Sequence, residues 1–183
     1  MILHRCFAWD RAARTPADEG GALFFARRYQ GDGRHDNPAV YGCLYTAEGE
    51  VSAVVESLRT FAGTARLPAR LERRGLPLSV AAIDLPNTEE LVDLDNPRLL
   101  ASNGLRPSLV ATRERGVTQP QALGLHSRYP GAAGLRWWST LESLWANVTL
   151  FDRCAQSLRV ERVRVLTFDD AAVLEAAEFL GLR

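Results

Sequence analysis

Three side chains of the sequence could together hold a phosphate, stack on a planar group and stabilise a cation. Arg34, Tyr45 and Glu56 follow one another at even intervals along the chain. A guanidinium fork binds phosphate oxygens at two points, an aromatic ring can stack on a planar group, and a fixed carboxylate stabilises a developing positive charge. We therefore take these residues as a candidate site and ask which other features complete it or contradict it.

Each candidate also has an ordinary structural explanation. Arg34 is equally typical of a solvated loop, Tyr45 of a core or rim position, and Glu56 of a solvent-facing helix position. Arg5 lies in an apolar segment and needs a partner, either the acid of a structural ion pair or a ligand. Ser139 follows two tryptophans and fits a cap or turn as well as a ligand contact.

The composition is that of a globular protein. A chain of 183 residues with 46% hydrophobic and 24% charged residues can form one domain, residues 1–183, with a sizeable core. The 22 basic and 22 acidic residues balance, which argues against a general nucleic-acid-binding protein. Every basic residue is an arginine, so Schiff-base chemistry and a Walker-type phosphate loop are excluded.

The cysteines and histidines form no recognisable site. There are three of each, far apart, without the spacing of a disulfide framework or of a metal site. A nucleophilic pair of Cys43 with His35 or His126 remains formally open, although no cysteine-protease signature surrounds it. No signal peptide and no run of about 20 apolar residues is present. The expectation is therefore a cytoplasmic, reduced protein with no metal and no membrane contact.

The hydrophobic pattern predicts an α+β domain in which mixed or antiparallel strands alternate with short helices. Gly31–Pro38 has turn chemistry, and Glu56 lies off the apolar stripe of a helix that begins near Glu48. Gly63–Gly75 is expected to be partly helical, and Asn87–Arg98 to form short turns. The predicted strands are Ile2–Trp9, Val40–Thr46, Leu76–Leu85, Gly134–Trp138, Val148–Asp152 and Val160–Phe168, and the later helices are Gln119–Arg128 and Asp169–Leu180.

Taken together, these segments resemble the RES domain family. The family's central pattern appears as Gly33-Arg34-His35-Asp36-Asn37-Pro38, Tyr41-Gly42-Cys43-Leu44-Tyr45 and Ala53-Val54-Val55-Glu56. Leu3-His4-Arg5 is similar to the family's opening, and Gly134-Leu135-Arg136-Trp137-Trp138-Ser139 followed by Leu150-Phe151-Asp152 is similar to its later pattern. His35 stands where the family usually has Phe or Trp, and Trp137 where it often has Tyr, so both positions keep a planar ring.

The resemblance implies a fold like that of the ADP-ribosyltransferases and a toxin that destroys NAD⁺. RES proteins are usually paired with an Xre-type helix-turn-helix antitoxin, so NAD⁺ and such an antitoxin are the implied partners, and an oligomeric complex is left open. NAD⁺ would be a substrate, and no cofactor is implied. Whether water or phosphate attacks stays open, as do ADP-ribosyl transfer to a macromolecule and a catalytically degenerate binding module.

The resemblance also implies a role for each candidate residue. The two arginines would hold the NAD⁺ phosphates, the tyrosine would position the nicotinamide end, the glutamate would be the catalytic carboxylate, and the serine would help to hold the substrate. These residues are Arg5 and Arg34, Tyr45, Glu56, and Ser139, with Ser127 as the alternative family serine.

Overall fold

The computed structural model describes residues 1–183, and its internal contacts divide the chain into two compact units. Unit 1 comprises Met1–Phe24, Thr46–Leu85 and Arg159–Arg183, and unit 2 comprises Phe25–Tyr45 and Pro86–Leu158. We describe each unit by itself. That the whole chain is one domain stays a prediction.

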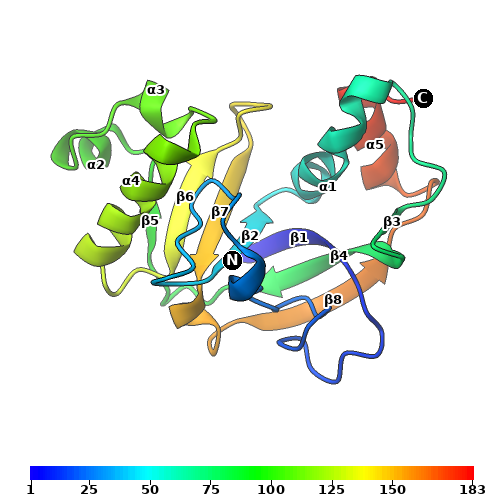
Figure 1. The fold of residues 1–183 in the computed structure, drawn as a ribbon, viewed down its shortest axis with the longest axis horizontal. Coiled ribbons are helices and arrows are strands. Elements are labelled where there is room, and N and C mark those ends of the chain that lie inside the picture. The colour runs from blue at the N-terminus through cyan, green and yellow to red at the C-terminus, as the bar shows by residue number, and fades with distance from the viewer. The chain divides into compact units, whose positions relative to one another are not determined.

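Unit 1 is built around strand β4 (Leu76–Asp84), which pairs antiparallel with β1 (Ile2–Ala8), β8 (Arg159–Val165) and the short β3 (Glu72–Arg73). Strand β2 (Cys43–Ala47) pairs antiparallel with β1, with His4 opposite Ala47. The predicted strands at both ends of the chain are therefore confirmed, and they meet on β4 (Figure 1).

Two helices cover this sheet and pack on each other, α1 (Glu50–Leu58) and α5 (Ala171–Leu180) (Figure 1). The apolar stripe of α1 is buried, which confirms the helical period seen in the sequence. The helix ends earlier than that stripe, because Arg59–Thr64 continues as the 3₁₀ helix η2. Asp170 is the N-cap of helix α5, where its side chain accepts from the N–H of Ala172, and Gly181, with φ 65°, is the C-cap.

The sheet of unit 2 is mixed. Strand β6 (Gly134–Trp138) pairs antiparallel with β7 (Ala146–Phe151) and parallel with β5 (Leu91–Asp93). A Cβ at Gly134 would lie 2.2 Å from the carbonyl oxygen of Thr149, so only glycine fits there. The helices of this unit are α2 (Pro97–Ser102), α3 (Pro107–Val110) and α4 (Arg115–Arg128), and its 3₁₀ helices are η1 (Arg27–Tyr29) and η3 (Asp152–Cys154).

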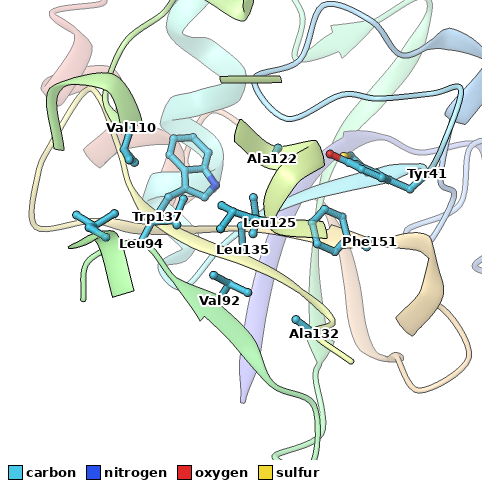
Figure 2. Close-up of a cluster of buried hydrophobic side chains, with 12 residues drawn as sticks. Tyr41, Val92, Leu94, Val110, Ala122, Leu125, Ala132, Leu135, Trp137 and Phe151 are labelled. Carbon is cyan, nitrogen blue, oxygen red and sulfur yellow. The ribbon is translucent and has the colours of Figure 1, made fainter. Parts of the chain in front are cut away.

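An apolar cluster forms the core of unit 2 (Figure 2). Leu135 and Trp137 of β6, Phe151 of β7 and Leu125 of α4 contribute its large side chains, and Tyr41 extends it. The cluster fixes α4 on the sheet, which matters for the site described below.

Three local predictions need correction, although the α+β class is confirmed. The segment Asn87–Arg98 forms strand β5 and not turns alone, because it pairs with β6. Residues after Thr64 are not helical and lead into a hairpin turned by Arg74 and Gly75, whose φ angles of 56° and 76° close a tight turn. Helix α4 begins at Arg115, earlier than predicted, and contains Pro120 in its interior. No helix is long and apolar enough to span a membrane.

Candidate functional site

The five candidate residues fall into two groups. Arg5 on β1 and Glu56 on α1 belong to unit 1, whereas Arg34, Tyr45 and Ser139 belong to unit 2.

Arg34 is a buried arginine, only 7% exposed, and not a solvated loop residue. Its Nη1 donates to the carbonyl oxygens of Val110 at 2.8 Å and Thr112 at 2.6 Å. Its guanidinium lies 4.8 Å from the ring centre of Trp137, a cation–π distance; Figure 2 shows Trp137 and Val110 close together in the core.

The Tyr45 hydroxyl closes the turn that carries Arg34. It donates to Asp36 Oδ1 at 2.7 Å and accepts from the backbone N–H of His35 at 3.0 Å. Asp36 Oδ2 in turn accepts from the N–H groups of Gly31 at 2.9 Å and Gly33 at 2.7 Å. Burial raises the pKa of Tyr45, so the phenol stays protonated. The structure therefore gives the Tyr45 hydroxyl a positioning role, and it makes Asp36 a second organiser of this turn.

His35 packs against the same tryptophan. Its Nδ1 lies 2.9 Å from Thr149 Oγ1, which also accepts from Trp137 Nε1 at 3.0 Å. Burial, with the charge of Arg34 as a second cause, lowers the pKa of His35 to about 3, so the imidazole is neutral at physiological pH. Thr149 is fully buried and was not singled out by any sequence pattern.

The structure does not support the nucleophilic pair of Cys43 with a histidine that the sequence left open. The Cys43 thiol is buried and donates to the carbonyl oxygen of His35 at 3.4 Å, not to an imidazole. Burial raises its pKa, so it does not form a thiolate at neutral pH. The ring of His126 stacks on Tyr41 at 4.3 Å.

Ser139 and Ser127 occupy different environments. Ser139 is 2% exposed, and its Oγ accepts from the N–H of Leu141 at 3.1 Å, as in a side-chain-closed turn. Ser127 is exposed on α4 and donates to the carbonyl oxygen of Leu123 at 3.0 Å. The assignment of the family serine to Ser139 stays a prediction.

In unit 1, Arg5 is half-buried and has no carboxylate partner. Its Nη1 donates to the carbonyl oxygens of Ala22 at 2.5 Å and Gly21 at 3.4 Å, and its guanidinium lies 5.3 Å from the ring centre of Phe7. Burial lowers its pKa to about 10, so it remains charged at neutral pH. A structural ion pair therefore does not explain this arginine.

Glu56 lies in the last turn of α1 with 26% of its side chain exposed. Its Oε2 is 3.3 Å from Nη1 of Arg59, three residues along the chain. No cluster of three or more His, Cys, Asp or Glu side chains that could hold a metal ion is present. Glu56 is thus a partly exposed carboxylate with a cation beside it, which can act through its charge.

Comparison with known proteins assigns the chain to a family. The RES domain model matches residues 2–170, so the chain belongs to the RES domain family. The structure is similar to a chain in the crystal structure of the MbcT–MbcA toxin–antitoxin complex of M. tuberculosis, with a TM-score of 0.64 and 18% sequence identity over 98% of this chain and 88% of that chain. None of the curated protein sequences matches the chain.

Proposed function

We propose that this protein is a toxin that cleaves NAD⁺ at the bond between nicotinamide and ribose. The observation that carries the proposal is the RES match over residues 2–170, a range that contains Arg34, Tyr45 and Glu56. Arg34 supports it further, because a buried guanidinium fixed by two carbonyls and an aromatic face is preorganised for an anion.

The chemistry requires little from the protein beyond charge and orientation. Nicotinamide in NAD⁺ is already a cationic leaving group, so no strong general acid is needed. As the bond breaks, positive charge develops on the ribose, as in glycoside hydrolysis. The Glu56 carboxylate would stabilise that charge more in the transition state than in the ground state.

The arginines would supply the binding. Arg5 is a charged side chain whose hydrogen-bond partners are backbone carbonyl oxygens, as expected of a residue that can bind a phosphate group, and Arg34 would join it. Holding the pyrophosphate fixes the glycosidic bond in a reactive position. Ser139 would assist in holding the substrate, and either water or inorganic phosphate would attack the ribose.

An antitoxin is the proposed protein partner. The similar solved structure is described as a toxin–antitoxin complex, which supports a toxin role for this chain and an antitoxin that inhibits it. We propose a helix-turn-helix protein of the Xre type for that role, in the cytoplasm and without direct contact of the toxin with nucleic acid.

The test is to incubate the purified protein with NAD⁺ labelled in its adenylate part, with and without inorganic phosphate. Cleavage predicts free labelled ADP-ribose, or its phosphate if phosphate is the acceptor, and a Glu56→Ala variant that forms neither. Label on a macromolecule added to the assay would indicate ADP-ribosyl transfer. Intact NAD⁺ after incubation with wild-type protein freed of any antitoxin would contradict the proposal and favour a binding module.

A further inference from the structure

We infer that the start of helix α4, through Thr118 and Gln119, is the element that positions Arg34 for its ligand. The inference rests on the proposed function, because it concerns the same arginine, and it assigns a role to residues outside the family pattern quoted above. Both residues lie within the first two turns of α4 (Arg115–Arg128), which is anchored on the apolar core of unit 2.

Gln119 and Arg115 hold the carbonyl groups at the beginning of the turn. Gln119 Nε2 donates to the carbonyl oxygens of Gly31 at 2.8 Å and Gly33 at 2.9 Å. Arg115 Nε donates to the carbonyl oxygen of Asp32 at 2.7 Å. The turn before Arg34 therefore has three consecutive carbonyls bound by one face of one helix.

Thr118 holds Arg34 itself. Its Oγ1 donates to the Arg34 carbonyl oxygen at 2.6 Å, and the threonine is only 2% exposed. Removing the hydroxyl would leave that carbonyl buried without this donor, an unfavourable state that the turn can relieve only by moving. A movement of the Arg34 backbone moves the guanidinium with it.

The contacts also run in the opposite direction. Arg34 Nη1 donates to the carbonyl oxygens of Val110 and Thr112, just before α4, and Asn37 Nδ2 donates to the carbonyl oxygen of Gln119 at 3.0 Å. The two ends of the Arg34 residue, its carbonyl group and its guanidinium, are thus both bonded to the segment 110–118. That segment fixes the direction of the guanidinium, and a displacement of about 1 Å at such a site can lower activity strongly.

The experiment measures kcat and KM for NAD⁺ in Thr118→Val, Thr118→Ser and Gln119→Glu. Thr118→Val and Gln119→Glu should raise KM about tenfold, which corresponds to about 1.4 kcal/mol of lost binding, with kcat changed much less. Thr118→Ser keeps the hydroxyl and should recover most of the affinity. Gln121→Glu is the matched control, because it adds the same charge two residues further along α4 at a side chain that makes no hydrogen bond.

A double-mutant cycle separates positioning from general destabilisation. Thr118→Val is measured again in an Arg34→Lys background, where the flexible ammonium depends less on the direction of the backbone. The inference predicts less than about a twofold further change in kcat/KM there. Equal effects in both backgrounds, or an unchanged KM in Thr118→Val and Gln119→Glu, would overturn it. A wild type that neither binds nor consumes NAD⁺ would instead reject the proposed function, and this inference with it.

Discussion

The two units hold their candidate residues in different ways. In unit 2, Arg34 is 7% exposed and lies in a buried network with Asp36, His35, Tyr45 and Thr149. In unit 1, Glu56 lies on a regular helix, 26% exposed, beside a surface arginine. A buried polar network is costly to disturb, because each lost partner leaves a desolvated group, whereas an exposed ion pair contributes little to stability.

Because of this difference in burial, we expect the candidate residues of the two units to respond differently to mutation. Substitutions in the Arg34 network should change stability and ligand affinity together. Substitution of Glu56 should change the chemical step and leave the fold intact.

Glu56→Gln should lower kcat for NAD⁺ cleavage by about 10²–10³, the range found when one electrostatic group of an active site is removed. Loss of the partly exposed pair with Arg59 should itself lower the free energy of unfolding by less than about 1 kcal/mol. Nicotinamide release and urea denaturation measure the two effects. A variant with wild-type kcat would remove Glu56 from the mechanism.

Tyr45→Phe should lower the free energy of unfolding by about 1–3 kcal/mol, because Asp36 Oδ1 and the His35 N–H both lose a buried partner. It should also raise KM for NAD⁺. Tyr29→Phe, at an exposed tyrosine of the same unit, is the control and should stay within about 0.5 kcal/mol. Equal stability of the two variants would show that the buried network is not what holds the turn.

The stability of unit 2 should depend on His35 in acid. Folding lowers the pKa of His35 from 6.5 to about 3. At a pH between these two values, the imidazole is protonated in the unfolded state and neutral in the folded state. Stability is therefore greatest above about pH 6.5 and falls by about 1.4 kcal/mol per pH unit as the pH drops towards 3. In His35→Phe this slope should disappear. The measurement is the denaturation midpoint of the wild type and of His35→Phe from pH 7 to pH 4. If both midpoints fall equally with pH, His35 does not contribute.

Arg59→Ala should give the smallest effect. The pair with Glu56 is a partly exposed i,i+3 helix pair of the kind worth about 0.2–0.5 kcal/mol, and kcat should change by less than about threefold. A large fall in kcat would mean that Arg59 sets the charge or orientation of Glu56. The candidate residue of unit 1 would then depend on its partner, as those of unit 2 do.

The sequence was informative where structure is local. Helices α1 and α5 could be predicted because their apolar residues recur at helical spacing, a few positions apart. The confirmed strands could be predicted from the composition of each segment. Strand β5 was missed because three residues give no period and its pairing partner begins more than forty positions later. The start of α4 was missed because Gly116 and Pro120 interrupt the helical pattern.

Only part of the candidate site could be predicted from the sequence. Arg34, Tyr45 and Asp36 lie in one short motif, so their proximity could be expected. Thr118 and Thr149 could not, because they meet Arg34 and His35 across separations of 84 and 114 residues. A threonine carries no sequence signal for a buried contact of that range, which only the folded chain reveals.

The most direct test of the central claim is a calorimetric titration of NAD⁺ into Glu56→Gln and Arg34→Ala, beside wild type at low temperature, where cleavage is slow. If Glu56 acts on the chemical step and Arg34 on binding, the Glu56→Gln protein will bind NAD⁺ within about threefold of wild type, less than 0.7 kcal/mol of affinity. The Arg34→Ala protein will bind at least about tenfold more weakly. Tight binding to Arg34→Ala together with lost binding to Glu56→Gln would contradict the account.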